Sequence, residues 1–172
     1  SRYCPICETN HEKFNSFGLN PREDALCPTC GSLERHRLSW LVIKDKIKNG
    51  DLTNNNLLHI APEKIFMEKF TSLFKENYLT ADLYNTNTKK KKDITNIDYS
   101  DESFDYIYCS HVLEHIQDDK KAMRELNRVL KKDGWAILLV PIMTKGPTEE
   151  DFSINTPEER MKHYGHPDHV RN

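Results

Sequence analysis

Residues 93–141 read DITNIDYSDESFDYIYCSHVLEHIQDDKKAMRELNRVLKKDGWAILLVP, and this segment decides the fold of the chain. Two short apolar runs, at residues 104–109 and 135–140, flank a stretch in which apolar residues recur at helical spacing. The acidic pair at residues 118–119 marks the expected start of that helix, and the Lys-Lys-Asp-Gly sequence at residues 131–134 marks its expected end. The segment is therefore predicted to form a strand, a helix and a second strand.

A crossover helix of this length joins parallel strands, and continuous apolar strands are typical of a parallel sheet that is buried on both faces. Two more strands are predicted upstream, at residues 57–61 and 78–83, joined by a helix over residues 63–74. The predicted fold class is α/β, with a Rossmann-like, doubly wound and mainly parallel sheet. Ligands bind beyond the carboxyl ends of such strands, which places residues 109–111 and 141–142 at the functional edge.

The composition limits the number of domains and the classes of partner. The chain has 172 residues, 37% of them hydrophobic, which is enough for one sizeable core and a small appendage. With 25 basic and 27 acidic residues the formal net charge is −2, so no overall basic field indicates a nucleic-acid partner. The sequence contains no apolar run long enough for a membrane span and no secretory signal, so we expect a cytoplasmic protein with no membrane partner.

Four of the five cysteines form two Cys-x-x-Cys pairs, Cys4 with Cys7 and Cys27 with Cys30, separated by 19 residues. This spacing is typical of a four-thiolate structural zinc site, and it predicts a small zinc ribbon over residues 1–31. A zinc ribbon can present a basic surface to nucleic acid, or it can order a segment that is too short to fold alone. The second role is favoured because acidic residues between the two pairs offset the basic ones.

The second predicted domain, residues 32–172, begins with a helix over residues 32–49 whose N-cap is Ser32. Three residues that can carry positive charge follow at positions 35–37, and we expect them near the zinc centre because four thiolates leave it negatively charged. The remaining parts of this domain are a cofactor-binding half at residues 57–142 and a substrate-facing tail at residues 143–172.

An acidic residue, Asp82, follows the end of the first predicted strand by about 20 positions. In nucleotide-binding α/β folds a carboxylate at this place accepts hydrogen bonds from the ribose hydroxyls. Asp82 is therefore the strongest single candidate for a cofactor-binding residue.

Together these residues resemble the class I S-adenosylmethionine-dependent methyltransferases over residues 57–142. The matching segments are residues 57–61, 81–83, 93–94, 103–108, 112–116 and 132–135. The resemblance implies S-adenosylmethionine as the cofactor, with Asp82 holding the ribose, Asp93 the adenine amino group and Ile94 the adenine ring through its backbone. It also implies that residues 109–111 contact the methionine end. Residues 30–37, after the second cysteine pair, are similar to a less characterised branch of these enzymes.

The first motif departs from the family, which has an acidic residue and a Gly-x-Gly turn where this chain has His59-Ile60-Ala61-Pro62-Glu63. Ala61 is the smallest choice after glycine, and Glu63 is placed to reach the ribose or the ammonium group of the cofactor. The predicted cofactor-binding residues are His59, Ala61, Pro62, Glu63, Asp82, Leu83, Asp93, Ile94, Cys109, Ser110 and His111. The alternative is a degenerate domain that keeps the sheet and binds no cofactor.

Methyl transfer from a sulfonium ion is an in-line displacement, so a general base is needed only when the acceptor must lose a proton. The candidates for orienting or deprotonating an acceptor hydroxyl are His111, His115, His166 and His169. His111, Glu114 and His115 also resemble the divalent-metal triad of ubiquinone-pathway O-methyltransferases, although Leu-Glu-His is widespread in the superfamily without metal. The lysine run at residues 89–92 is expected to be a solvated loop, and the final strands of the family are expected to be missing.

The sequence thus predicts a methyltransferase that uses S-adenosylmethionine, carries a structural Zn²⁺, and acts on a small molecule or a glycan precursor. One alternative is an RNA methyltransferase in which the zinc ribbon binds the nucleic acid. Another is a non-catalytic interaction module built on the same fold.

Overall fold

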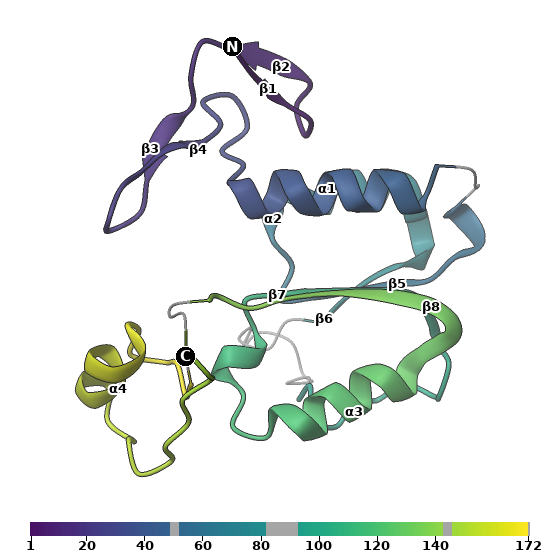
Figure 1. The fold of residues 1–172 in the computed structure, drawn as a ribbon. Coiled ribbons are helices and arrows are strands. Elements are labelled where there is room, and N and C mark those ends of the chain that lie inside the picture. Colours follow the sequence, from purple (N-terminus) through teal and green to yellow (C-terminus); the bar gives the residue numbers. More distant parts are fainter. Residues whose placement is uncertain (49–51, 82–92, 143–145, 172) are drawn as a thin grey trace. The chain divides into compact units, whose positions relative to one another are not determined.

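A computed structural model of the 172-residue chain describes residues 1–48, 52–81, 93–142 and 146–171 (Figure 1). The chain divides into two compact units. The cysteine unit comprises Ser1–Thr53 and Glu63–Leu73, and the sheet unit comprises Asn54–Pro62 and Phe74–Asn172. This division differs from the predicted boundary at residue 31, because the two helices that flank the first strand of the sheet group with the cysteines. No helix in the described ranges has the length and apolar character needed to span a membrane.

Two short antiparallel hairpins begin the cysteine unit, as expected for a small zinc ribbon. Their strands are β1 (Arg2–Cys4) with β2 (Thr9–His11), and β3 (Asn15–Phe17) with β4 (Arg22–Leu26). The first Cys-x-x-Cys pair begins at the end of β1, and the second pair follows β4 directly. Each pair therefore lies where a tight turn follows a strand.

The rest of the cysteine unit is formed by α1 (Glu34–Lys46) and most of α2 (Lys64–Phe74). Their aromatic side chains pack together, with ring centroids 6.4 Å apart for Trp40 and Phe66 and 5.3 Å apart for the stacked pair Phe66 and Phe70. The ammonium group of Lys69 lies 4.6 Å from the centroid of the Trp40 ring, a cation–π contact. These contacts hold α1 and α2 together within the cysteine unit.

The sheet unit is built on four parallel strands in the order β6-β5-β7-β8 (Figure 1). Their bounds are β5 (Leu57–Ile60), β6 (Tyr78–Ala81), β7 (Phe104–Ser110) and β8 (Leu130–Leu139). The predicted α/β fold with a parallel sheet is confirmed. Because β6 follows β5 on one side and β7 lies on the other, the winding of the sheet reverses between β5 and β7, which is where such sheets bind their ligands.

Helix α3 (Asp119–Val129) lies along one face of this sheet (Figure 1). Its apolar stripe, Ala122, Leu126 and Val129, joins buried residues of the strands in one core. The predicted helix start is confirmed, because the Asp118 carboxylate accepts a hydrogen bond of 2.9 Å from the backbone N–H of Lys121.

The remaining helical segments are short. They are η1 (Leu52–Asn54), η2 (Lys75–Asn77), η3 (Leu113–His115) and α4 (Pro157–Tyr164). Thr156 caps α4 together with Glu159 in a capping box, and Gly165 ends it in the left-handed conformation.

One local prediction is wrong. Residues 131–134 do not cap a helix in the way predicted, because α3 ends at Val129 and the chain continues directly into β8. The register between β7 and β8 shifts here, so that Phe104 pairs with Leu130 but Tyr106 pairs with Trp135. A Cβ atom on Gly134 would lie 2.6 Å from the carbonyl oxygen of Asp105, so glycine is needed for this irregular stretch of strand.

Candidate functional site

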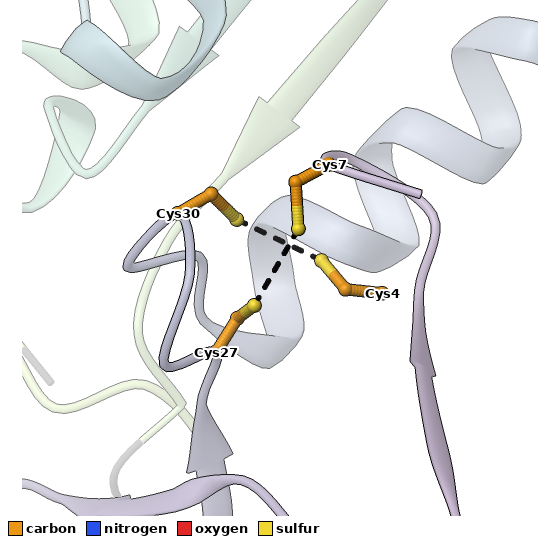
Figure 2. A group of neighbouring side chains, drawn as sticks. All are labelled: Cys4, Cys7, Cys27 and Cys30. Carbon is orange, nitrogen blue, oxygen red and sulfur yellow. Dashed lines mark hydrogen bonds between the residues drawn. The ribbon is translucent and has the colours of Figure 1, made fainter. Parts of the chain in front are cut away.

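The four cysteine sulfur atoms converge on one point in the cysteine unit (Figure 2). All four Sγ atoms lie within 4.8 Å of one another, and the pairs Cys4–Cys30 and Cys7–Cys27 are 3.7 Å apart. A regular tetrahedron with metal–sulfur bonds of about 2.3 Å has sulfur–sulfur edges of about 3.8 Å. The spacing therefore fits a four-thiolate metal site, and all four cysteines are free of disulfide bonds.

A second layer of polar groups surrounds these sulfurs. The hydroxyl of Ser32, which is fully buried, lies 3.3 Å from Cys4 Sγ and 3.2 Å from Cys30 Sγ. Burial opposes ionisation of Cys4, but hydrogen bonds from Ser32 and from backbone N–H groups outweigh it and lower the pKa of this thiol to about 6. Ser32 is therefore not the predicted helix cap, because α1 begins at Glu34 with Leu33 as its N-cap.

Two polar side chains that were not predicted from the sequence, Thr9 and His11, lie on the other side of the cluster. The hydroxyl of Thr9 lies 2.9 Å from Cys7 Sγ, and His11 Nε2 lies 2.8 Å from Thr9 Oγ1 and 3.6 Å from Cys27 Sγ. The Thr-Asn-His strand that follows the first cysteine pair was the available signal, since alternate residues of a strand share a face.

The three residues at positions 35–37, after the second cysteine pair, are used in two ways. Arg37 donates a hydrogen bond of 2.6 Å to the carbonyl oxygen of Ser32, next to the cluster. Arg35 Nη2 and His36 Nε2 instead contact the Glu63 carboxylate, at 2.9 and 2.7 Å. Burial opposes ionisation of Glu63, but these two partners outweigh it and hold its pKa at about 2. Glu63, a predicted cofactor residue, is thus bound within the cysteine unit.

In the sheet unit, the carboxyl ends of β5 and β7 carry two residues in the left-handed backbone conformation. Ala61 follows β5 with a φ of 48°, and His111 follows β7 with a φ of 55°. Each such residue other than glycine costs about 1–2 kcal/mol. Glu8, Asp24, Lys75 and Glu102 also have a positive φ, but of the described residues only Ala61 and His111 combine it with a place directly after a strand of the sheet, on either side of the point where the winding reverses.

The predicted residues within the strands are buried. His59 lies inside β5, where its Nδ1 is 2.8 Å from the hydroxyl of Tyr78, so its side chain is already bonded within the sheet. Cys109 is 1% exposed, and burial together with the charge of Glu114 raises its pKa to about 12, so it is an inert thiol. Ser110 is 4% exposed, and its hydroxyl has no hydrogen-bond partner among the described residues.

The loop before β7 brings two predicted adenine-binding residues to the ends of β5 and β6. Asp93 and Ile94 line a hollow of about 20 Å³ together with Ile60 and Ala81, and Ile94 is 3% exposed. Asp93 Oδ1 accepts hydrogen bonds of 2.8 and 2.7 Å from the backbone and hydroxyl of Thr95, which fixes this loop. Other predictions, for Asp82, Leu83 and the lysine run at residues 89–92, lie outside the described residues.

The imidazole ring of His111 contacts the buried carboxylate of Glu114. Its Nδ1 is 3.2 Å from Glu114 Oε1, its side chain is 38% exposed, and that of Glu114 is only 4% exposed. Burial raises the pKa of Glu114, but the contacts with His111 and His115 outweigh it, so the net shift is downward. A buried carboxylate beside one ring nitrogen holds the imidazole in one orientation.

The tail returns to the same edge and is anchored there by Arg171. Arg171 is 9% exposed, and its guanidinium donates to the carbonyl oxygens of Leu113, Ile116 and Gln117 at 2.9, 2.7 and 3.0 Å. This anchor brings His166 and His169 against His115, so three of the four predicted catalytic histidines form one cluster.

A pocket of about 350 Å³ opens between the tail, η3 and the end of β8. Its lining is formed by Leu113, Glu114, Asp119, Met123, Val140, Pro141, Ile142, Gly146, Thr148 and Arg171. The predicted edge residues Pro141 and Ile142 are thus brought to the same cavity as the buried Glu114.

Three comparisons with known proteins bear on this unit. Residues 58–138 match the family described as "Methyltransferase domain". The uncharacterized methyltransferase YcgJ of Bacillus subtilis (strain 168) is 36% identical over 73 residues, which cover 42% of this chain and 27% of that protein. The family match includes β6 and β7 in full and all but one residue of β5 and of β8. It supports a methyltransferase domain of the S-adenosylmethionine-dependent kind.

Two solved structures are similar to the chain. The crystal structure of YcgJ has a TM-score of 0.44 at 18% identity, covering 80% of this chain and 62% of that one. A crystal structure described as a SAM-dependent methyltransferase from Aquifex aeolicus has a TM-score of 0.45 at 15% identity, covering 63% of this chain and 68% of that one.

Proposed function

We propose that the chain is an S-adenosylmethionine-dependent methyltransferase whose sheet unit holds the cofactor beyond the carboxyl ends of β5 and β6. The observation that carries this proposal is the pair of left-handed residues, Ala61 and His111, on either side of the reversal in a sheet whose residues 58–138 match a methyltransferase domain. Bound there, the cofactor supplies an electrophilic methyl group on a sulfonium ion.

The residues present suit such a ligand. At Ala61 the chain leaves β5 with only a methyl side chain, the smallest after that of glycine, so no bulky side chain occupies this turn. The buried hydroxyl of Ser110, without a partner among the described residues, can bond the polar methionine end. Asp82, by its place after β6, is proposed to accept hydrogen bonds from the ribose, and Asp93 from the adenine amino group.

We propose His111 as the residue that removes a proton from the acceptor. Its Nδ1 faces Glu114 at 3.2 Å, which leaves Nε2 of a partly exposed ring to accept the proton of a hydroxyl. The negative charge of Glu114 then stabilises the imidazolium that forms. Methyl transfer itself needs only that the acceptor oxygen be held in line with the methyl group, with water excluded.

The acceptor is proposed to be a small hydroxylated molecule or a glycan precursor. The pocket of about 350 Å³ lies at the lower end of the size range for small-molecule sites, and its apolar wall carries the carboxylates of Glu114 and Asp119. Arg171, the one cation among the described lining residues, is already paired with Asp119 and Glu150, so the lining offers no free positive charge to a phosphate backbone, which argues against RNA as the acceptor in this pocket.

The cysteine unit is proposed to bind one structural Zn²⁺ through Cys4, Cys7, Cys27 and Cys30. Four thiolates at tetrahedral spacing, with Ser32, Thr9 and His11 available as donors, give a closed site with no position for a substrate. Zinc would therefore act by ordering the two hairpins.

The test is a methyl-transfer assay with labelled S-adenosylmethionine and a panel of small hydroxylated acceptors, sugars and RNA. For an active acceptor, His111→Gln is expected to reduce turnover at saturating cofactor while leaving the affinity for S-adenosylhomocysteine unchanged. An affinity that falls together with turnover would show that His111 binds the cofactor instead. Transfer to RNA alone would overturn the small-molecule proposal.

A further inference from the structure

Three histidines from distant parts of the sequence meet where the tail packs on η3. His115 belongs to η3, and His166 and His169 follow α4. One ring nitrogen of each lies within 4.8 Å of the others, and the ring centroids are 4.6 to 5.7 Å apart. Among the described residues, the four cysteines form the one other cluster with this potential for metal binding.

The hydrogen bonding of the rings leaves ligand atoms available. His115 Nδ1 lies 3.2 Å from the carbonyl oxygen of Asp168, which can only accept, so Nδ1 is the donor nitrogen and Nε2 is the nitrogen that can bind a metal ion. An imidazole that donates to a backbone carbonyl in this way is typical of metal-bound histidines. His169 is 8% exposed, and its Nδ1 has no hydrogen-bond partner in the described part of the chain.

The surrounding charge also suits a cation. Glu114 Oε1 is 3.8 Å from His115 Nε2, and Glu114 Oε2 is buried with no hydrogen-bond partner among the described residues. No hydrogen bond joins the three imidazole rings to one another within the described ranges. A buried carboxylate beside three unlinked imidazoles is an arrangement that a divalent ion would stabilise.

We propose that His115, His166 and His169 bind one divalent transition-metal ion of the Zn²⁺ or Co²⁺ class. Imidazole nitrogen suits these ions, and three protein ligands leave at least one position open. The backbone N–H of Asp168 donates to His166 Nδ1 at 3.2 Å. If His166 binds the ion through Nε2, Nδ1 must carry the ring proton and can no longer accept, so this hydrogen bond is lost and the metal–nitrogen bond replaces it.

The histidine cluster adjoins Glu114, which lines the 350 Å³ pocket. An acceptor hydroxyl bound at the ion would lose its proton more easily, since metal coordination lowers the pKa of bound oxygen. This last step rests on the proposed function, whereas metal binding by the histidines does not.

The experiment counts metal ions in the full chain after dialysis against Co²⁺. Two ions per chain are expected for the wild type, one with the thiolate-to-cobalt absorption of the cysteine cluster and one without it. His166→Ala should lose only the second ion. His166 is exposed, so this variant is expected to fold, which circular dichroism checks. The matched control is His163→Ala, an exposed histidine in α4 outside the cluster, which should keep both ions.

One ion in the wild type, or two in His166→Ala, would overturn the proposal. Equal loss in both histidine variants would show that binding is non-specific, which also overturns it. S-adenosylhomocysteine binding is measured separately on the same samples. Two ions per chain without S-adenosylhomocysteine binding would support the metal site and reject the methyltransferase. S-adenosylhomocysteine binding with one ion per chain would support the methyltransferase and reject the metal site.

Discussion

Replacing Ala61 by glycine should stabilise the sheet unit, although glycine usually weakens a fold. The left-handed φ of 48° at Ala61 costs about 1–2 kcal/mol that glycine would not incur. Two effects oppose this gain. The greater conformational entropy of glycine stabilises the unfolded chain by about 0.4–1 kcal/mol, and the folded state loses about 0.4 kcal/mol from burial of the half-buried methyl group. The net expectation is a gain of about 0.5 kcal/mol. The hydrogen bond from the Ala61 N–H to the carbonyl oxygen of Ala81, at 2.8 Å, is retained.

The matched control is Ala122→Gly, the same chemical change at a fully buried position inside α3. There glycine costs about 1 kcal/mol of helix propensity and about 0.8 kcal/mol of methyl burial, so the two variants should differ by about 2 kcal/mol with opposite signs. Urea unfolding followed by Trp135 fluorescence, in a Trp40→Phe background, measures the sheet unit alone. If Ala61→Gly is destabilised as much as Ala122→Gly, the strained turn proposed as the cofactor edge does not exist.

Three further changes test other parts of the structure. Glu125 has a pKa of about 2, first because Arg128 hydrogen-bonds it and further because the Ile97 N–H does. Because the pKa is lower in the folded state, ionised Glu125 stabilises the fold at pH values above the normal pKa of 4.5. This contribution to the free energy of unfolding is lost as the pH falls toward 2. Glu125→Gln should therefore cost about 1 kcal/mol at pH 7 and nothing near pH 2, and a cost independent of pH in urea titrations would contradict this. Ser32→Ala should lower zinc affinity roughly tenfold in chelator competition, and unchanged affinity would deny its hydroxyl a role at the sulfurs. Gly134→Ala should cost about 1–3 kcal/mol in urea, because its Cβ would lie 2.6 Å from a backbone oxygen. Gly146→Ala is its control, because no atom of the described residues lies within 4 Å of the added Cβ, and it should change stability by less than about 0.5 kcal/mol.

Features set by neighbouring residues were predictable from the sequence. The apolar run of β7, the acidic start of α3 and the Thr156 capping box each depend on residues within one turn or strand. The four-cysteine cluster was predictable as well, since the spacing of the two pairs carries the chemistry of the site.

Features set by distant contacts were not predictable. Gly134 follows two lysines, as at a helix end, but the pairing of β8 with β7 makes it part of a strand instead. Ser32 has the chemistry of a cap, but the sulfurs of Cys4 and Cys30 use its hydroxyl. The tail histidines were visible in the sequence, yet their meeting with His115 depends on Arg171, which anchors the tail to η3.

The most direct test of the central claim is calorimetric titration of S-adenosylhomocysteine into the full chain. We expect saturable binding of one ligand per chain. Asp82→Ala should weaken this binding by about 1–3 kcal/mol, because charge-assisted hydrogen bonds to the ribose are lost. Asp133→Ala, which removes an exposed carboxylate in β8, should leave the affinity unchanged. The absence of binding heat at millimolar ligand, or an equal effect of the two substitutions, would contradict the central claim.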